Sequence, residues 1–326
     1  MKLAILGAGA WGSALATSLS ERHEVALWTR SASDCAALAR SRVSPYLPEV
    51  PLPRAVEIEA DLARALRGTR QVIVATATAG LRPTLAALAA IAPDTDVIWA
   101  CKGFEAASGE LPHQIVEAAL PRARRAAALS GPSFALEVAR GQPTAIVLAA
   151  RDAAFAGACA AALNSPRLRV YSSDDLVGVE LGGALKNVIA IAAGICDGLG
   201  LGRNARAALI TRGLAEIARL GVAMGGRPET FAGLAGLGDL VLTCTGELSR
   251  NREVGVRLAQ GRALEAVLGE LGHVSEGVSS ARAARRHALE HGVEMPITEA
   301  VCAVLFEGRA PREAVQQLLA RDPRRE

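Results

Sequence analysis

The chain has 326 residues, of which 51% are apolar, and it carries 36 basic against 33 acidic side chains. This length exceeds what one hydrophobic core of ordinary size accommodates, and it predicts two domains. The net charge of +3 is too small and too dispersed for a protein that binds nucleic acid or a membrane surface, so we expect neither partner.

Short apolar runs alternate with stretches rich in alanine and leucine through the first half of the chain. Parallel strands that are buried on both faces read as such continuous apolar runs. The pattern therefore predicts a Rossmann-like, doubly wound parallel sheet with helices between its strands. The predicted strands are Leu3–Leu6, Val25–Trp28, Val72–Thr76, Val97–Cys101, Ala126–Ser130 and Ala145–Leu148.

A glycine-rich turn follows the first predicted strand directly. Gly7, Gly9 and Gly12 have the spacing GxGxxG, and the turn opens a helix predicted over Ser13–Ser20. The first glycine permits a tight turn, the second lets the backbone approach a pyrophosphate, and the third lets the helix pack closely on the strand. The helix N-terminus then supplies amide donors for the phosphates. Between a strand and a helix, this motif predicts a dinucleotide site.

The end of the second predicted strand selects the cofactor in folds of this class. A carboxylate there binds the ribose 2′-hydroxyl of NAD and repels the 2′-phosphate of NADP. The segment Trp28–Ser31 contains no acid, and Arg30 can pair with the extra phosphate. We therefore expect NADP(H) to be accepted and favoured, with NAD(H) as the other cofactor. If Arg30 only lies on the surface, it has no influence on this choice.

A proline-rich segment, residues 45–53, comes next along the chain. It is too stiff for a helix or a central strand, and we expect a surface loop near the edge of the sheet.

Lysine is rare in this chain, since only Lys2, Lys102 and Lys186 stand among the 36 basic residues. Arginine cannot release its proton, whereas lysine can, so a retained lysine suggests proton transfer. Lys102 follows a predicted strand, and ligands bind at the carboxyl ends of strands in open α/β sheets. The alternative is that a biased composition left three lysines by chance.

The segment Gly131-Pro132-Ser133-Phe134-Ala135 follows another predicted strand and precedes a short helix. It can present backbone amides and a hydroxyl to a bound ligand. The alternative is an ordinary turn whose serine caps the helix.

From about Asp174 onward, long helical patterns replace the strands. We therefore expect a dinucleotide-binding domain over 1–173 and an all-helical substrate domain over 174–326. The apolar stretch Val188–Cys196 lies between Lys186 and Asp197 and falls short of a membrane-spanning helix, so we expect no membrane insertion. The predicted helices include Asn204–Met224, Ser249–Gln260, Val278–His291 and Ile297–Phe306.

Lys186 lies in an apolar run of small residues. An ammonium is unexpected there unless burial lowers its pKa for proton transfer; the alternative is that its head reaches out to water. Reduction of a ketone with a nicotinamide cofactor needs an acid to protonate the developing alkoxide. None of the five histidines has a suggestive context, so Lys186 is the better candidate. If Lys102 converges on the same pocket, each lysine lowers the pKa of the other.

Ser249, Arg250 and Asn251 open a predicted helix. A serine cap, a forked guanidinium and an amide at a helix N-terminus make a suitable phosphate site, although a pair of solvated arginines is the alternative. Asp239 stands among glycines and leucines, where an acid either caps the next helix or orients a charged partner, for which Lys186 is the candidate.

The six cysteines are far apart and show no metal-ligand spacing. They are typical of reduced, mostly buried thiols, so we expect a cytoplasmic protein without a metal. The first apolar run meets the glycine turn too early for a signal sequence.

Together these segments resemble the bacterial-type NAD(P)-dependent glycerol-3-phosphate dehydrogenase family over nearly the whole chain. The blocks around Lys186 and Ser249 are specific to that family, unlike the glycine motif. The matching segments are GAGAWGSALA at 7–16, YLP at 46–48, CKG at 101–103, SGPSFA at 130–135, ELGGALKNVIAIAAGICDGLGLGRNARAALITRGLAE at 180–216 and AGLGDLVLTCTGELSRNREVG at 235–255.

The resemblance implies reversible reduction of dihydroxyacetone phosphate to sn-glycerol 3-phosphate by NAD(P)H, which supplies phospholipid synthesis. It also implies a homodimer and a two-domain, 6-phosphogluconate-dehydrogenase-like fold. It assigns Lys186 as the proton donor and acceptor. The implied substrate contacts are Lys102, Gly131, Ser133, Asn187, Asp239, Ser249, Arg250 and Asn251.

The resemblance also assigns cofactor contacts beyond the glycines and Arg30. The serine that the family commonly has after the second glycine is Ala10 here, so only its backbone contact survives. The added contacts are Ala10, Trp11, Tyr46, Lys102, Ala135, Arg250, Val274 and Glu276.

Two alternative functions stay open at this point. A reductase resembling ketopantoate reductase would act on a carboxylate substrate and would not need the segment Ser249–Asn251. A non-catalytic NADP-binding sensor would keep the fold without turnover, but it has no use for Lys186 as an acid.

Overall fold

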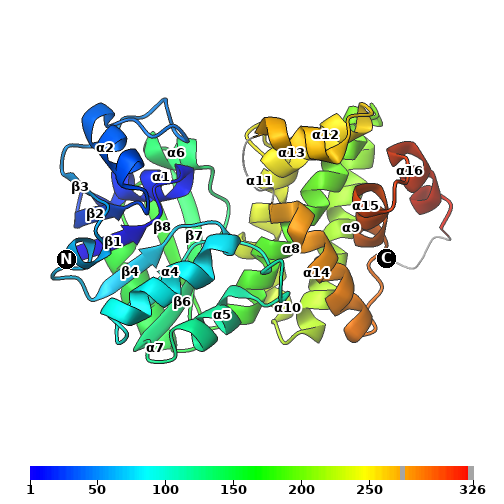
Figure 1. Cartoon of the computed structure of the whole chain (residues 1–326). Helices are drawn as coiled ribbons and strands as arrows, with labels where there is room; N and C mark the ends of the chain where they lie inside the picture. The colour runs from blue at the N-terminus through cyan, green and yellow to red at the C-terminus, as the bar shows by residue number, and fades with distance from the viewer. Residues whose placement is uncertain (272–275, 322–326) are drawn as a thin grey trace. The chain divides into compact units, whose positions relative to one another are not determined.

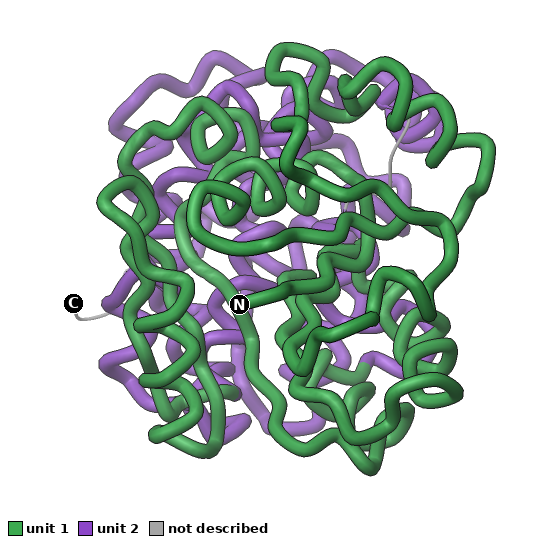
Figure 2. The backbone as a smooth tube through the Cα atoms, turned by 90° about the vertical axis from the view of Figure 1, so that its left-hand side faces the viewer, with its two compact units in different colours: residues 1–102, 110–176 green, residues 103–109, 177–326 purple. Residues whose placement is uncertain are grey.

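The structure is a computed structural model that describes residues 1–271 and 276–321. Its backbone contacts divide the chain into two compact units (Figure 2). Unit 1 comprises Met1–Lys102 and Glu110–Leu176, and unit 2 comprises Gly103–Gly109 and Val177–Glu326. The short segment Gly103–Gly109 therefore groups with unit 2, although the chain on both sides of it belongs to unit 1.

Unit 1 is built on an eight-stranded sheet with the strand order β3-β2-β1-β4-β5-β6-β7-β8 (Figure 1). The doubly wound sheet is confirmed, but it is mixed, because β6 and β7 are antiparallel while the other neighbours are parallel. The strands are β1 (Lys2–Leu6), β2 (Glu24–Trp28), β3 (Val56–Glu59), β4 (Gln71–Val74), β5 (Asp96–Trp99), β6 (Arg125–Ser130), β7 (Thr144–Ala149) and β8 (Leu168–Ser173). The helices of unit 1 are α1 (Ala10–Leu19), α2 (Ala32–Ser41), α3 (Leu62–Ala65), α4 (Thr78–Ile91), α5 (Pro112–Ala119), α6 (Ala135–Ala139) and α7 (Ala153–Leu163).

The two edge strands, β3 and β8, are absent from the strands expected from the sequence. Their sequences, VEIE and LRVYSS, mix polar and apolar residues, and much of each strand is exposed or only partly buried. A search for continuous apolar runs finds strands that are buried on both faces and misses edge strands of this kind.

The core of unit 1 joins helices to one face of the sheet. Leu3 and Ile5 of β1 form one cluster with Leu15 of α1 and Phe155 of α7, and all four are almost fully buried. Because alternate residues of a strand face the same side, α1 and α7 pack on the face that Leu3 and Ile5 present. This packing fixes the start of α1 relative to the end of β1.

The proline-rich segment, residues 45–53, forms a loop as expected, but it packs more closely than a simple surface loop. Leu47 and Leu52 are buried. Arg42, in the left-handed conformation at φ 57°, donates hydrogen bonds to the carbonyl oxygens of Leu52 at 3.4 Å and Val56 at 2.9 Å. The loop is thereby held to the chain on either side of it.

Unit 2 is helical in its described residues, as expected. Its longest helix, α8, has 23 residues and runs through Lys186. The limits placed on this apolar segment from the sequence, Lys186 and Asp197, were therefore too narrow. By length and composition α8 could cross a membrane, but 94% of its most apolar window is buried inside the protein, as in a core helix. The helices are α8 (Leu176–Gly198), α9 (Gly202–Ala223), α10 (Pro228–Ala232), the π-helix η1 (Leu234–Gly238), α11 (Asp239–Thr245), α12 (Arg250–Ala259), α13 (Leu264–Leu271), α14 (Glu276–Glu290), α15 (Pro296–Phe306) and α16 (Pro311–Leu319).

Two glycines bring α8 and α12 into backbone contact. A Cβ atom on Gly194 would lie 1.9 Å from the Arg252 carbonyl oxygen, and one on Gly255 would lie 2.0 Å from the Ile191 carbonyl oxygen. Any side chain at either position would separate the helices. The N-terminus of α12 is therefore fixed against the helix that carries Lys186.

A buried carboxylate caps α15 from α9. Glu216 is 2% exposed and accepts hydrogen bonds from the backbone N–H groups of Ile297 at 2.6 Å and Thr298 at 3.1 Å. These N–H groups belong to the first turn of α15, where backbone N–H groups have no acceptors within the helix. Burial raises the pKa of the Glu216 carboxyl from 4.5 to about 7, although the hydrogen bonds oppose the shift.

Glu216 predicts a fall in stability as the pH rises from about 4.5 to about 7. Over that window the unfolded chain has released the proton that the folded chain still holds, so the free energy of unfolding declines by up to about 3 kcal/mol and then stays level. Urea denaturation at a series of pH values measures this decline. Glu216→Gln should flatten it; the same decline in the variant would contradict the assignment.

Candidate active site

The glycine turn of unit 1 has the geometry that a phosphate-binding turn requires. Gly7 has φ +118°, and a Cβ atom on Gly12 would lie 1.9 Å from the Gly7 carbonyl oxygen. A Cβ atom on Gly9 would meet nothing within 4 Å, so the backbone there faces open space. Gly9 caps α1 without a side-chain hydrogen bond, which leaves the first amides of the helix for a ligand.

Two buried polar atoms, one in this turn and one on the segment that lies against Gly7, support the fit of the turn to a dinucleotide. The Trp11 Nε1 and Thr76 Oγ1 atoms are buried and have no hydrogen-bond partner within the described residues. Buried polar atoms are normally satisfied, so orphaned ones are consistent with a ligand site. Trp11 and Ala135 also pack on one small cluster with Leu47, which brings three segments of the expected cofactor site together. Tyr46, the neighbour of Leu47 in that loop, is exposed.

Arg30 lies two residues beyond the end of β2 and is exposed. No carboxylate in the described ranges pairs with it. The neighbouring edge strand, however, ends in Glu59, which lies opposite Trp28 in the parallel register. This carboxylate was not expected from the sequence, because β3 was not among the predicted strands. The end of β2 therefore has both a cation and an acid beside it.

Three expected substrate contacts meet at the ends of β5 and β6. Lys102 Nζ donates a hydrogen bond to the Gly131 carbonyl oxygen at 2.8 Å, and Ser133 Oγ donates to the same oxygen at 2.9 Å. Gly131 has φ +119°, a conformation that L side chains rarely adopt. Phe134, not Ser133, takes the cap position of α6, so the serine is not an N-cap.

Lys186 and Asp239 form a buried ion pair in unit 2. Their exposed fractions are 7% and 1%, and Lys186 Nζ donates directly to Asp239 Oδ1. Burial disfavours the ammonium form of the lysine, whereas the carboxylate favours it. The pairing expected from the sequence is present, and the lysine head does not reach out to water.

The backbone around this pair explains why it forms. Lys186 lies in the middle of α8, and Asp239 begins α11 directly after the π-helix η1. A Cβ atom on Gly182, one turn before Lys186, would lie 2.4 Å from the Ala235 carbonyl oxygen, so α8 packs directly on η1. Thr243 Oγ1 donates to the backbone carbonyl oxygen of Asp239 at 2.6 Å. It also lies 3.5 Å from the side-chain Oδ1 of Asp239. Sequence reasoning missed this threonine, although its i+4 spacing from Asp239 is a usable signal.

A chain of amide hydrogen bonds joins three helices beside the ion pair. Asn251 Nδ2 donates to Asn187 Oδ1 at 2.9 Å, and the Gly277 N–H donates to Asn251 Oδ1 at 3.1 Å. The chain connects α8, α12 and the start of α14, where Glu276 lies. Gly277 was not predicted, because only the fold brings it to Asn251. The expected contact Val274 lies outside the described residues.

The N-terminus of α12 is capped and carries a cation. Ser249 Oγ accepts a hydrogen bond from the Arg252 N–H at 3.3 Å, as predicted for a cap. Arg252 is not solvated, since it pairs with Asp197 at 2.7 Å. Arg250 is exposed, and within the part of the chain that the structure describes no carboxylate pairs with it. Its guanidinium and the helix N-terminus together suit a phosphate group.

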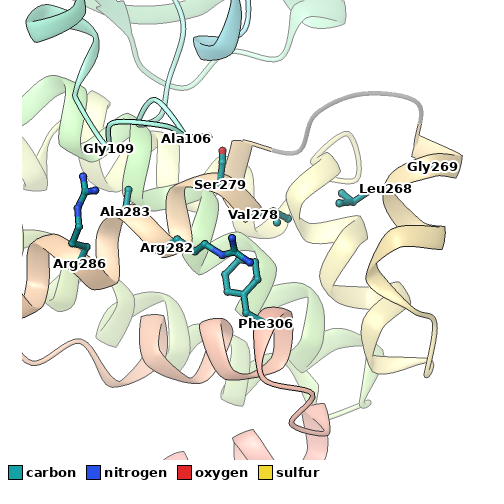
Figure 3. A pocket seen from close by; sticks show the side chains of 10 residues that line it. All are labelled: Ala106, Gly109, Leu268, Gly269, Val278, Ser279, Arg282, Ala283, Arg286 and Phe306. Carbon is teal, nitrogen blue, oxygen red and sulfur yellow. The ribbon is translucent and has the colours of Figure 1, made fainter.

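A cavity of about 810 Å³ lies elsewhere on unit 2 (Figure 3). None of its lining residues is an expected site residue, so the cavity is separate from the atoms described above. It is lined by Ala106, Gly109, Leu268, Gly269, Val278, Ser279, Arg282, Ala283, Arg286 and Phe306.

Two family models match this chain. The model of the NAD-dependent glycerol-3-phosphate dehydrogenase N-terminus matches residues 2–156, and the model of the corresponding C-terminus matches residues 175–316. A curated relative, the glycerol-3-phosphate dehydrogenase (NAD(P)+) of Aromatoleum aromaticum, is 58% identical over the full length of both chains.

Two solved structures are similar to this chain, one over sequence and fold and one over the fold alone. The glycerol-3-phosphate dehydrogenase of Coxiella burnetii has a TM-score of 0.93 and 40% identity, over 98% of this chain and 99% of that one. A ketopantoate reductase from Ralstonia eutropha has a TM-score of 0.60 and 17% identity, over 97% and 100% of the two chains. The second likeness concerns the fold alone.

The ion pair predicts a large loss of stability for Asp239→Asn. Removing the carboxylate from a buried pair leaves a charge without its compensation, so the free energy of unfolding should fall by about 3 kcal/mol or more. Chemical denaturation measures it. Asp94→Asn, which breaks an exposed pair with Arg122, is the matched control and should cost less than about 1 kcal/mol. Equal effects of the two substitutions would contradict the interpretation.

Proposed function

The chain belongs to the NAD-dependent glycerol-3-phosphate dehydrogenase family, and from that premise we infer that Lys186 is the general acid of its reaction. The enzyme catalyses the NAD(P)H-dependent reduction of dihydroxyacetone phosphate to glycerol 3-phosphate. Reduction leaves negative charge on the carbonyl oxygen, which must receive a proton. The buried pair of Lys186 with Asp239 is the observation that carries this assignment.

The neighbouring carboxylate suits Lys186 to this task. Because Asp239 favours the ammonium form, Lys186 enters the reducing direction with a proton to give. The neutral amine left afterwards can take a proton from the alcohol in the reverse direction. Arginine could not serve, since it does not release its proton in proteins. Thr243 Oγ1 lies 3.5 Å from Asp239 Oδ1, and we assign it as a residue that positions this carboxylate.

We assign the substrate phosphate to the N-terminus of α12. Arg250 supplies a guanidinium there, and the Ser249 cap fixes the first turn of the helix. Asn251 and Asn187 complete the site with their amides, which are oriented by their mutual hydrogen bond. Binding the phosphate, which does not react, supplies energy that positions the ketone for reduction.

The cofactor belongs to unit 1 in this proposal. When bound, the reduced nicotinamide cofactor supplies the hydride. The amides from Gly9 to Gly12 would hold its pyrophosphate, with Trp11 and Ala135 beside them. Lys102, Gly131 and Ser133 would add contacts to substrate and nicotinamide. Arg30 favours the 2′-phosphate of NADP, and Glu59 opposes it.

The proposed role in the cell follows from the product. Glycerol 3-phosphate is the backbone of glycerophospholipids, so the reaction supplies their synthesis. We further propose a cytoplasmic homodimer without a nucleic-acid partner and without a membrane-inserted segment. The dispersed charge and the burial of α8 support the last two points; the homodimer rests on the family resemblance.

Replacing Lys186 should remove the chemical step, and Lys186→Ala should also lower the free energy of unfolding, because it leaves the buried Asp239 carboxylate without its partner. We expect Lys186→Ala and Lys186→Arg each to lower kcat by about 10²–10⁴-fold, the usual contribution of a general acid. The Kd for NADPH, measured by fluorescence titration, should stay near that of the wild type and reports on correct folding. Lys2→Ala is the control. Near-wild-type turnover in either Lys186 variant would exclude this residue as the acid.

The end of β2 predicts how the cofactor preference can be shifted. Arg30→Ala should lower the ratio of kcat/KM for NADPH over NADH by about tenfold, the value of one charge-assisted hydrogen bond. Glu59→Gln should raise the same ratio, because it removes a like charge beside the 2′-phosphate. Arg40→Ala, an exposed change on α2, is the control. If neither Arg30→Ala nor Glu59→Gln moves the ratio, these residues do not select the cofactor.

A further inference from the structure

The last turn of α14 and the residue after it carry a cluster of possible metal ligands that the reaction does not use. His287, Glu290 and His291 have the spacing H-x-x-E-H, with which some zinc enzymes bind their metal from one helix. One ring nitrogen of each histidine and one carboxylate oxygen lie within 4.8 Å of one another. No metal was expected from the sequence, because the cysteines lack metal-ligand spacing and the histidines have no suggestive context.

Backbone carbonyls decide which nitrogen of each histidine is available. His287 Nε2 lies 2.9 Å from the Gly109 carbonyl oxygen, and His291 Nδ1 lies 2.9 Å from the His287 carbonyl oxygen. A carbonyl can only accept, so these two nitrogens carry the hydrogens. Metal-binding histidines are commonly oriented in this way, with the second nitrogen donating to a carbonyl. His287 Nδ1 and His291 Nε2 are therefore the nitrogens that can bind a cation.

The His287 ring is packed so that its Nδ1 faces the Glu290 carboxylate. The ring packs on Phe104, with centroids 5.3 Å apart, and its Nδ1 lies 3.1 Å from Glu290 Oε2. A lone pair and a carboxylate oxygen at this separation repel unless a proton or a metal ion lies between them. Ligand atoms around tetrahedral zinc are about 3.3 Å apart, which matches this separation.

The helix dipole favours a cation here, whereas a neighbouring arginine opposes it. The site lies at the C-terminal end of a 15-residue helix, where the helix dipole is negative. Arg286 occupies the other carboxylate oxygen, with its Nε 3.6 Å from Glu290 Oε1, and donates to the Ser108 carbonyl oxygen at 2.6 Å. Figure 3 shows its side chain directed toward Gly109. Arg286 is thus a positive charge beside the cluster, and its contact with Oε1 leaves Oε2 for the metal.

We propose that His287, Glu290 and His291 bind a divalent transition-metal ion of the zinc class. Two imidazoles and a carboxylate suit zinc, with the remaining coordination position left to water. Through His287 the ion would tie the end of α14 to the segment Gly103–Gly109, which directly follows Lys102. Its expected effect is to stabilise that segment.

The test is Zn²⁺ titration of the full-length chain, stripped of metal, by isothermal calorimetry at about pH 8, where free imidazoles are neutral. We expect one Zn²⁺ per chain, a higher Tm when it is bound, and binding weakened by at least about tenfold in His291→Ala and in Glu290→Gln. His291 and Glu290 are exposed, so both variants should fold. His23→Ala, which removes a histidine outside the cluster, should bind as the wild type does. Three results would each overturn the proposal: no saturable binding by the wild type, unchanged binding in His291→Ala, or equal weakening in His23→Ala.

Discussion

A lysine and an aspartate that are buried together, Lys186 and Asp239, constrain how unit 2 can be built. Two charges removed from water are tolerable only when they meet in good geometry, because each loses several kcal/mol or more of hydration. That requirement fixes α8 against η1 and α11, and the missing side chain of Gly182 permits the approach. The same packing that joins these helices therefore holds the ammonium of Lys186, which is carried on a flexible side chain, in one place.

Close backbone approach is the second constraint, and it serves both units. Gly12 lets α1 start directly over the turn that follows β1, which leaves its first amides available to a phosphate group. Gly194 and Gly255 do the equivalent in unit 2, where they hold the capped start of α12 against α8. In each unit the atoms that would bind phosphate belong to the N-terminus of a helix that is held by close backbone packing. Binding groups on such rigid elements are positioned more precisely than groups on loops.

The sequence predicted those parts of the site that depend on local pattern. The glycine motif, the serine cap at Ser249 and the unusual burial of Lys186 are all visible within a few residues. The edge strand β3 and its terminal Glu59 were not, because an edge strand lacks the continuous apolar run by which buried strands are recognised. Gly277 depends wholly on tertiary contact. The length of α8 was underestimated because a lysine was taken as its limit, whereas the lysine is buried within it.

The central claim is that Lys186 supplies the proton, and chemical rescue tests it most directly. In Lys186→Ala, a small primary amine such as methylammonium can occupy the space of the missing side chain beside Asp239. The account predicts that kcat for dihydroxyacetone phosphate rises with the amine concentration in the variant and does not change in the wild type. A variant that binds NADPH and substrate but gains no rate from the amine would contradict it.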